Sequence, residues 1–212
     1  MSKTSGVLMD LGRSPHARLR PVPLTAVEFA DGVWAPRRAT IREETIREQL
    51  VQCEKTGRID NFRRASGRRE IADHQGLVFN DSDVYKALEA AGYALMEGVS
   101  PELEELIEAV IDEIAAAQQP DGYLNTAFMF NRASARYTNL TQEHEFYCYG
   151  HMIQAAIAHR RGTGRDTFFD VAIRVAEHLV ATFGPGKRDA TDGHEEIEMA
   201  LDEERDLSAG RK

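Results

Sequence analysis

The sequence predicts an all-α fold assembled from helical hairpins. Apolar residues recur every three or four positions over several long segments, the spacing that places them on one face of a helix. Short turns join some of these segments, and long aromatic or glycine-rich connections separate the resulting pairs. This alternation is typical of stacked helical hairpins. No pattern in the chain requires a βαβ unit or a parallel sheet.

The N-terminal part of the chain has the weakest pattern. Residues 1–23 contain arginines and prolines without an apolar period, so we expect an irregular lead-in. Residues 27–34 alternate weakly around an Asp-Gly turn signal and predict a short strand or hairpin. Pro36 then precedes a charged helix expected over residues 39–55. Its positions at helical spacing are Ile41, Thr45, Ile46 and Leu50.

The middle of the chain begins with a glycine-containing connection, which residues 56–80 are expected to form. The next helix should start at Asp81 or Ser82, either of which can act as the N-cap, and end at Gly98. Its buried stripe is expected to be Val84, Ala87, Leu88, Ala91 and Leu95.

The clearest helix follows. Ser100, Pro101 and Glu102 supply a cap, a proline suited to the first helical position and an acidic residue near the positive end of the helix. The turn at residues 118–122 ends this helix, and residues 123–139 are expected to be irregular. The apolar residues of the helix are Leu103, Leu106, Ile107, Val110, Ile111 and Ile114.

The C-terminal part predicts two more complete helices and the start of another. The first is expected over residues 142–161, and the Gly-Thr-Gly sequence at 162–164 separates it from a helix over residues 166–183. A Gly-Pro-Gly sequence at 184–186 ends that helix. A further helix should begin near His194.

The composition excludes several classes of function. The chain of 212 residues carries 26 Lys and Arg against 35 Asp and Glu, a formal net charge of −9. Phosphate binding requires a basic face, so neither nucleic acid nor an anionic membrane is an expected partner, and we interpret the charge as a solvated surface. No apolar run approaches the roughly 18 residues of a membrane span, and the N-terminus lacks the apolar region of a secretory signal.

Cysteine usage points to a reducing compartment. Cys53 and Cys148 cannot form a disulfide framework and do not lie in a Cys-x-x-Cys pair, so we expect free thiols and a cytoplasmic location. The sequence also lacks a dinucleotide-binding glycine motif after a strand, a phosphate-binding loop and a Gly-x-Ser-x-Gly elbow. Nucleotide binding and serine hydrolase chemistry are therefore not indicated.

Two polar clusters lie at predicted helix ends. In residues 79–86, Asp81 and Asp83 could bind a sugar hydroxyl or a cation, but capping of a helix and its dipole explains them more simply. In residues 117–126, Tyr123 and a nearby asparagine offer the stacking and hydrogen bonding that sugars need. A helix stop would require only the turn itself.

The richest cluster spans residues 144–151. His144, Tyr147, Cys148 and His151 lie three or four positions apart and so share one helical face. Spacing alone leaves open satisfied polar residues of a core, a ligand contact through the first histidine, a zinc site, and a catalytic Cys-His pair.

A fourth cluster, residues 192–198, places a glycine before His194 at a helix start. This arrangement can expose the imidazole to a cavity. A charged helix entrance explains the three glutamates that follow equally well.

Five blocks of sequence occur in order and at plausible spacing. They are Gly-Arg-Ile-Asp-Asn-Phe-Arg-Arg-Ala (57–65), Gly-Leu-Val-Phe-Asn-Asp-Ser-Asp-Val-Tyr-Lys (76–86), Ala-Gln-Gln-Pro-Asp-Gly-Tyr-Leu-Asn-Thr (117–126), His-Glu-Phe-Tyr-Cys-Tyr-Gly-His-Met (144–152) and Gly-His-Glu-Glu-Ile-Glu (193–198). Each block alone is weak evidence for a family, whereas five blocks in the same order and spacing are strong evidence. Together they resemble the N-terminal part of glycoside hydrolase family 127, whose characterised members are β-L-arabinofuranosidases. The resemblance extends from Val22 to Leu201.

The resemblance implies an (α/α)6 barrel followed by β-sandwich domains, with a sugar pocket in the mouth of the barrel. Residues 24–201 would form the N-terminal portion of that barrel, which is therefore incomplete. By the same resemblance, His144 and His194 hydrogen-bond the hydroxyls of an arabinofuranoside-type sugar. Four more residues are implied to lie near this pocket or to support it: Asp81, Asp83, Tyr123 and Glu145.

The family resemblance also concerns catalysis. In family 127 a cysteine thiolate bound to zinc is the nucleophile, and a further glutamate is the acid/base. The resemblance places those residues beyond Lys212, so we expect no catalytic residue, no metal site and no cofactor in this chain, with zinc expected in full-length relatives. Cys148 belongs to the histidine cluster and is not interpreted as the nucleophile, and Cys53 lies in no motif.

After Leu201 the sequence departs from the family pattern. Residues 202–212 are polar and short where the family continues with an apolar helix, which indicates a truncated product that is inactive alone. An unfinished barrel would leave apolar faces without partners, so we expect marginal stability or self-association. Two other interpretations stay open: a non-catalytic helical module that binds carbohydrate or a protein, and another sugar enzyme of the α/α toroid, such as a polysaccharide lyase or an unsaturated glucuronyl hydrolase.

Overall fold

The computed structural model describes residues 11, 14–30, 32–70 and 73–209. In this part of the chain all regular structure is helical, and the β-type pairing is limited to an isolated bridge between Phe183 and Arg188. The α-helices are α1 (Trp34–Thr40), α2 (Ile46–Lys55), α3 (Arg58–Ala65), α4 (Asp81–Leu95), α5 (Pro101–Ala117), α6 (Leu140–Glu143), α7 (Glu145–Thr163), α8 (Thr167–Thr182) and α9 (Ile197–Ser208). The shorter turns are η1 (Leu24–Ala26), the π-helical η2 (Ile41–Thr45), η3 (Thr126–Phe128) and η4 (Ala133–Ala135).

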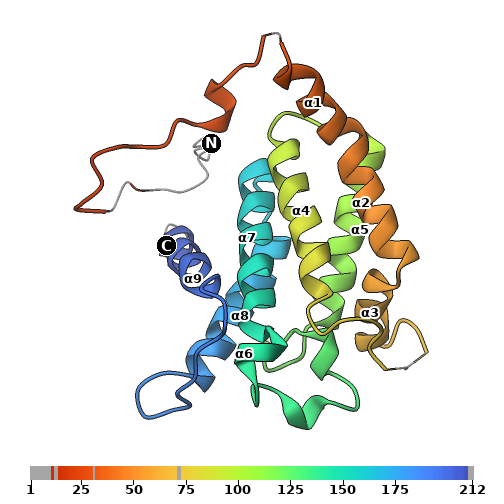
Figure 1. The fold of residues 1–212 in the computed structure, drawn as a ribbon, viewed down its shortest axis with the longest axis vertical. Coiled ribbons are helices and arrows are strands. Elements are labelled where there is room, and N and C mark those ends of the chain that lie inside the picture. Colours follow the sequence, from red (N-terminus) through yellow and green to blue (C-terminus); the bar gives the residue numbers. More distant parts are fainter. Residues whose placement is uncertain (1–10, 12–13, 31, 71–72, 210–212) are drawn as a thin grey trace.

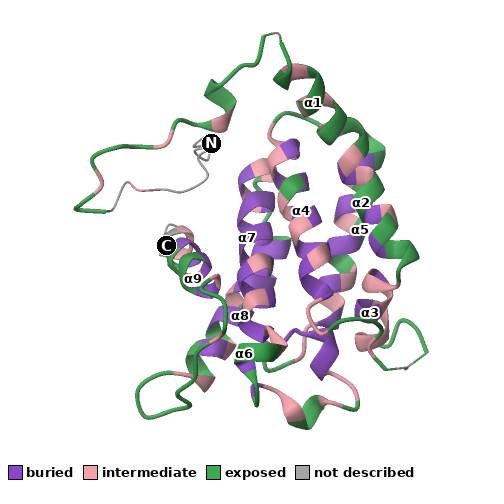
Figure 2. Cartoon of the chain, in the orientation of Figure 1, coloured by how far each residue is buried: buried purple, intermediate pink, exposed green. Residues whose placement is uncertain are grey.

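The helices form two layers (Figure 1). α4, α7 and α9 lie in one layer, and α5 and α8 lie behind them. α4 and α7 form the most extensive contact between any two described elements, and both are buried along most of their length (Figure 2). α2 packs against α4, and α3 packs against α5. The prediction of an all-α fold of paired helices is confirmed.

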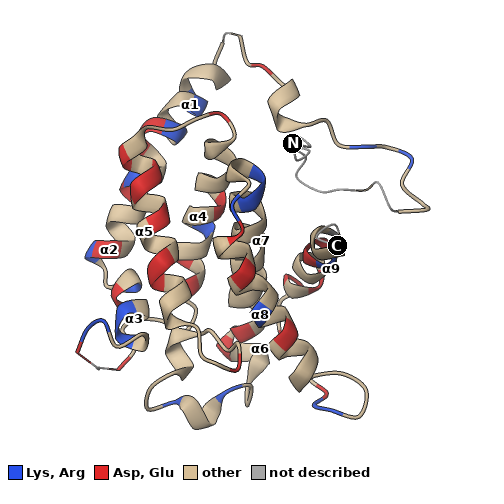
Figure 3. Ribbon diagram, turned by 180° about the vertical axis from the view of Figure 1, so that it is seen from behind, with Lys and Arg blue, Asp and Glu red and all other residues tan. Residues whose placement is uncertain are grey.

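The acidic residues that set the net charge lie largely on the outside. Seen from behind, ribbon segments of Asp and Glu are frequent along α2 and α5 (Figure 3), and most of these residues are exposed or partly exposed. This distribution agrees with the interpretation of the charge as a solvated surface. Within the described residues, no helix combines the length and the apolar character that crossing a bilayer requires.

Two glycines allow α4 and α7 to approach closely. A Cβ at Gly92 of α4 would lie 2.6 Å from backbone atoms of Ala158 and His159 on α7. In the opposite direction, a Cβ at Gly162 of α7 would lie 2.4 Å from the carbonyl oxygen of Gly92. The two backbones therefore touch where any larger residue would force them apart.

The helix α5 follows its local signals closely. Ser100 is its N-cap, and the Ser100 hydroxyl accepts a hydrogen bond of 3.2 Å from the backbone N–H of Leu103. Pro101 is the first helical residue, where a missing N–H has no consequence. The predicted apolar residues are buried except for Leu106, which is partly buried. α8 likewise begins and ends within one residue of its predicted limits.

The strand or hairpin predicted over residues 27–34 is wrong. Residues 27–30 have no regular structure, residue 31 lies outside the described part, and Trp34 begins α1. Val27, Phe29 and Val33 are exposed, so their weak alternation has no sheet on which to pack. The helix also starts before residue 39, because a proline in its first turn, Pro36, interrupts no helical hydrogen bond.

The extended connection predicted over residues 56–80 contains a helix, α3. Gly57, at φ 77°, ends α2 in a left-handed conformation and lets the chain restart directly. Ile59 and Phe62, three positions apart, are buried and give α3 its apolar face. Arginine-rich surroundings diluted this two-residue signal, and those charges are paired in the fold: Arg63 bonds Glu54, Asp60 and Glu113.

The start of α4 differs from expectation. Asn80 precedes α4, and neither Asp81 nor Ser82 acts as its N-cap. α9 begins at Ile197, three residues after His194 and so near the expected start, and it includes residues 202–208 of the polar segment. Residues 210–212 of that segment lie outside the described part. Arg161 and Glu203 form an ion pair of 2.6 Å with side chains 4% and 7% exposed, which ties α9 to α7.

The close approach of α4 and α7 predicts the effect of Gly92→Ala. The added methyl group must displace the α7 backbone, so we expect the free energy of unfolding to fall by about 1–3 kcal/mol. Urea unfolding followed by circular dichroism measures the change. Ala90→Ser, on the exposed side of the same helix, is the matched control and should stay within about 0.5 kcal/mol of the parent chain. Equal stability of the Gly92 variant and the parent would contradict the role given to this contact.

Candidate functional site

Two histidines that are far apart in the sequence meet at the N-terminal ends of α7 and α9. The ring centroids of His144 and His194 lie 4.9 Å apart. The ring of Phe79, which precedes α4, lies 5.5 Å from that of His144 in an edge-on arrangement. The ring of Tyr147 lies 5.8 Å from His144 and 5.1 Å from His194. Three helix starts therefore contribute to one cluster of rings, which we call the histidine cluster.

Local backbone features bring the two histidines together. His144 separates α6 from α7 and has a left-handed backbone, with φ 58° and ψ 32°. A Cβ at Gly193 would lie 2.6 Å from the carbonyl oxygen of Thr141, so the segment before His194 passes directly over α6. A Cβ at Gly150 would lie 2.4 Å from Glu196, so the start of α9 rests against α7. Glycine is required at both crossings.

Tyr147 is the centre of the polar contacts. Its hydroxyl bonds the ammonium group of Lys86, and that ammonium lies 4.7 Å from the centroid of the Tyr147 ring. Its backbone N–H donates to Asp192 Oδ2 at 3.0 Å, which secures the segment that carries His194. Tyr147, Lys86 and Asp192 were not among the predicted site residues. The spacing of residues 144, 147 and 151 was the available signal for Tyr147.

His151 lies on the inner side of this cluster. Its ring packs edge-on against Tyr147 at 4.5 Å, and its Nδ1 lies 3.5 Å from a carboxylate oxygen of Glu196. Burial, assisted by the charge of Lys86, lowers the pKa of His151 to about 4. The imidazole is therefore neutral at neutral pH, and its contact with Glu196 is not an ion pair. Burial also raises the pKa of Glu196.

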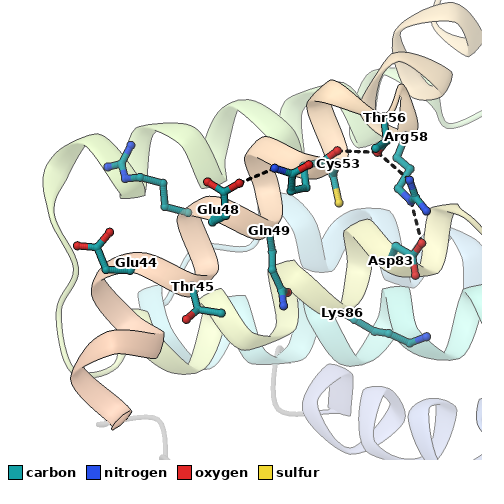
Figure 4. Close-up of a pocket in the computed structure, with 11 residues that line it drawn as sticks. Glu44, Thr45, Glu48, Gln49, Cys53, Thr56, Arg58, Asp83 and Lys86 are labelled. Atoms are coloured by element: carbon teal, nitrogen blue, oxygen red, sulfur yellow. Dashed lines mark hydrogen bonds and ion pairs between the residues drawn. The ribbon is translucent and has the colours of Figure 1, made fainter. Parts of the chain in front are cut away.

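Asp83 faces a neighbouring groove instead of the histidines. It forms an ion pair of 2.8 Å with Arg58 of α3. The groove, of about 900 Å³, lies between α2 and α4 and is lined mainly by polar side chains (Figure 4). Lys86 also lines it, so one side chain borders both the groove and the histidine cluster. The groove was not predicted, because α3 and its Arg58 were interpreted as part of a connection.

Asp81 is buried beneath the cluster, with 1% of its surface exposed. Its two carboxylate oxygens accept from the backbone N–H of Thr126 at 2.7 Å and from the Thr126 hydroxyl at 2.6 Å. The Thr126 hydroxyl also lies 2.9 Å from His74 Nδ1. Burial raises the pKa of Asp81. In this position the side chain holds the loop after α5 and has no surface open to a ligand.

Tyr123 and Glu145 form a second buried pair, each with 0% of its surface exposed. The Tyr123 hydroxyl donates to Glu145 Oε1 at 2.5 Å, and the backbone N–H of Tyr137 donates to Oε2 at 2.6 Å. Burial raises the pKa of Glu145 to about 7, although both hydrogen bonds oppose that shift. Of the six predicted site residues, the structure brings His144 and His194 together, places Asp83 on the groove, and places Asp81, Tyr123 and Glu145 in the supporting interior.

Neither cysteine has the environment of a reactive thiolate. Cys148 is fully buried and Cys53 is buried at 6% exposure. Burial raises the pKa of both thiols, so they are protonated at neutral pH. Among the described residues, no three His, Cys, Asp or Glu side chains are grouped as a metal site. The two buried, protonated thiols of Cys53 and Cys148 do not fit a zinc-thiolate centre.

Paired helices in two layers, with a polar and aromatic site where helix N-termini converge, are the arrangement expected of part of an α/α-barrel domain. The sequence profile of the β-L-arabinofuranosidase GH127 catalytic domain matches residues 26–204. The chain belongs to this family, which confirms the resemblance found in its motifs.

Individual relatives agree with this assignment. The chain is 41% identical over 168 residues to a non-reducing end β-L-arabinofuranosidase from Bifidobacterium longum subsp. longum, a match that covers 76% of this chain and 25% of that protein. A GH127 β-L-arabinofuranosidase from Geobacillus stearothermophilus T6 has a similar structure, with a TM-score of 0.82, 38% identity, and coverage of 86% of this chain and 30% of that one. A second GH127 β-arabinofuranosidase also gives a TM-score of 0.82, at 35% identity, covering 98% and 33%. The chain spans a quarter to a third of the length of these relatives.

The lowered pKa of His151 predicts a specific dependence of stability on pH. Between about pH 4 and pH 6.5 the unfolded chain binds a proton at this residue that the folded chain does not, so its contribution to stability is lost as pH falls through this interval. We expect His151→Gln to remove about 1–2 kcal/mol of the acid destabilisation, a value reduced for partial exposure. Urea unfolding at pH 7, 5.5 and 4 measures this, with His16→Gln, at an exposed histidine, as the control. If the free energy of unfolding depended on pH identically in His151→Gln and in the parent chain, the lowered pKa of His151 would be refuted.

The burial of Cys53 and Cys148 predicts slow thiol chemistry. In the native chain, both should react with a disulfide reagent such as DTNB roughly a hundredfold more slowly than in urea, because the reagent needs an accessible thiolate. Absorbance during the reaction gives the rate, and Cys53→Ser and Cys148→Ser assign it to each residue. Rapid native labelling at Cys148 would show that the thiol is available after all.

Proposed function

We propose that this chain binds the terminal arabinofuranosyl group of an arabinofuranoside against the paired rings of His144 and His194, as the N-terminal portion of a GH127-type β-L-arabinofuranosidase barrel. The observation that carries the proposal is the convergence of the two imidazoles, with centroids 4.9 Å apart, at the ends of separate helices. Both histidines lie within the residues that match the GH127 catalytic domain, which supports assigning them to a sugar rather than to another ligand.

The chemistry of the cluster suits a sugar. An imidazole in its neutral form offers one donor and one acceptor, which matches the dual character of a sugar hydroxyl. His144 is half-buried, and its Nδ1 is a buried atom without a hydrogen-bond partner among the described residues. His194 is exposed, and the rings of Phe79 and Tyr147 provide apolar surface for the C–H faces of a furanose. Lys86 and Asp192 hold Tyr147 in place.

The proposal assigns binding, and not bond cleavage, to the residues of this chain. Glycoside hydrolysis of the retaining type needs a nucleophile and an acid/base beside the glycosidic bond. Cys148 and Cys53 are buried thiols with raised pKa, and Asp81 and Glu145 are buried with both oxygens engaged. We infer that the chain supplies sugar contacts and that the reacting groups belong to other parts of the family fold.

Titration with methyl β-L-arabinofuranoside tests this function. Histidine ring resonances in NMR spectra should shift for His144 and His194 in the parent chain. His144→Ala and His194→Ala should each weaken binding roughly tenfold, the effect of one lost hydrogen bond with a buried partner. His16→Ala is the matched control because this exposed histidine lies outside the cluster, and its affinity should equal that of the parent.

Two results would count against the sugar-binding function. One is the absence of any shift at His144 and His194 up to millimolar sugar, while the chain remains folded. The other is equal response to an unrelated sugar such as methyl β-D-galactopyranoside, which would leave no specificity for arabinofuranosides. Turnover of an aryl β-L-arabinofuranoside by the isolated chain would overturn the statement that the reacting groups lie elsewhere.

A further inference from the structure

Glu145 anchors the segment after α5 to the start of α7 through two hydrogen bonds. It is the first residue of α7, it has no exposed surface, and its two carboxylate oxygens accept from the Tyr123 hydroxyl and the Tyr137 backbone N–H. Both oxygens therefore point into the protein. The same hydrogen bonds tie the irregular segment after α5 to the first turn of α7.

Two residues connected to Glu145, Tyr137 and His144, have an unusual backbone conformation. Tyr137 and His144 are the non-glycine residues with positive φ in the described part of the chain, and each has φ 58°. A left-handed backbone costs an ordinary residue about 1 kcal/mol or more, so the surrounding contacts must enforce it. Glu145 accepts directly from the N–H of Tyr137 and is covalently next to His144. One side chain thus connects the two strained positions.

Neighbouring groups restrict the movement of this anchor. The Tyr137 hydroxyl lies 3.0 Å from that of Tyr149, one turn further along α7. The Arg136 guanidinium lies 3.8 Å from the centroid of the Tyr123 ring, and its Nε donates to the carbonyl of Phe128 at 3.0 Å. The segment around Tyr137 is consequently fixed at several points, and Glu145 transmits that rigidity to the start of α7.

We propose that Glu145 is a positioning residue, which holds His144 in its left-handed conformation and so keeps the His144 ring against that of His194. The proposal rests on the function proposed above for the two histidines, and it gives Glu145 no contact with the sugar. It predicts that losing the hydrogen bonds of Glu145 displaces His144, whereas losing only its charge does not.

Three variants separate these effects. Glu145→Leu keeps the size but removes both acceptors. Glu145→Gln keeps one acceptor for the Tyr137 N–H and a donor for the Tyr123 oxygen, and serves as the conservative rescue. Asp81→Leu is the matched control, because it also removes a buried carboxylate that accepts two hydrogen bonds, here from Thr126.

The readouts are the nuclear Overhauser effect between the His144 and His194 rings, the free energy of unfolding, and the dissociation constant for methyl β-L-arabinofuranoside. We expect the His144–His194 effect to vanish in Glu145→Leu and to persist in Glu145→Gln and Asp81→Leu, although both leucine variants lose stability. Affinity should fall roughly tenfold for Glu145→Leu and less than twofold for Glu145→Gln. If Glu145→Leu does not fold, Tyr123→Phe, which removes one donor, should weaken the ring contact in a folded chain.

The outcomes distinguish this proposal from the function on which it rests. Retention of the His144–His194 contact in Glu145→Leu, or in Tyr123→Phe where that variant replaces it, overturns the positioning role. Equal loss of the contact in Asp81→Leu also overturns it, since the effect would then reflect general destabilisation. Failure of the parent chain to bind the sugar overturns the proposed function alone, because the ring contact is measured without ligand.

Discussion

The contact between α4 and α7 is the constraint on which the rest of the structure depends. Gly92 and Gly162 let the two backbones touch, and this contact sets the position of one helix along the other. Because of that register, Lys86 in the second turn of α4 meets Tyr147 in the first turn of α7. α9 then joins the pair across Gly150, which brings His194 to the same place. The candidate site follows from how helix ends are packed, and no single loop creates it.

Helices could be predicted from the sequence where their caps and apolar spacing are local features of the chain. α5 carries a serine cap, a proline at its first position and a regular apolar stripe, and all three do in the structure what they do in an isolated helix. α3 could not be predicted, because its apolar face consists of Ile59 and Phe62 and its stability comes from α5 and from charges on other helices. Where tertiary packing sets the limits of a helix, the local spacing of apolar residues does not reveal them.

The candidate site was predictable in part. The motifs identified His144 and His194, and the family assignment explains why such motifs recur, but spacing alone could not show that two helix starts converge. The spacing of residues 144, 147 and 151 predicted a shared helical face, and their rings are in contact in sequence order. His144, however, precedes the first residue of α7 in a left-handed conformation and does not lie within the helix. A lysine such as Lys86 is typically expected on the surface, and its contact with Tyr147 follows from the packing of α4 on α7.

The carboxylates show why residue type does not determine role. Asp81 and Asp83 are two positions apart on α4, so they face different directions: Asp81 turns inward to Thr126, and Asp83 turns outward to Arg58. The segment from Tyr123 to Asn139 contains few backbone hydrogen bonds of its own, and its buried N–H groups need acceptors. Buried carboxylates meet this need, Asp81 at Thr126 and Glu145 at Tyr137. In this irregular aromatic loop beside the histidine cluster, acidic residues satisfy the interior N–H groups, and in a sequence such acidic residues resemble ligand-binding residues.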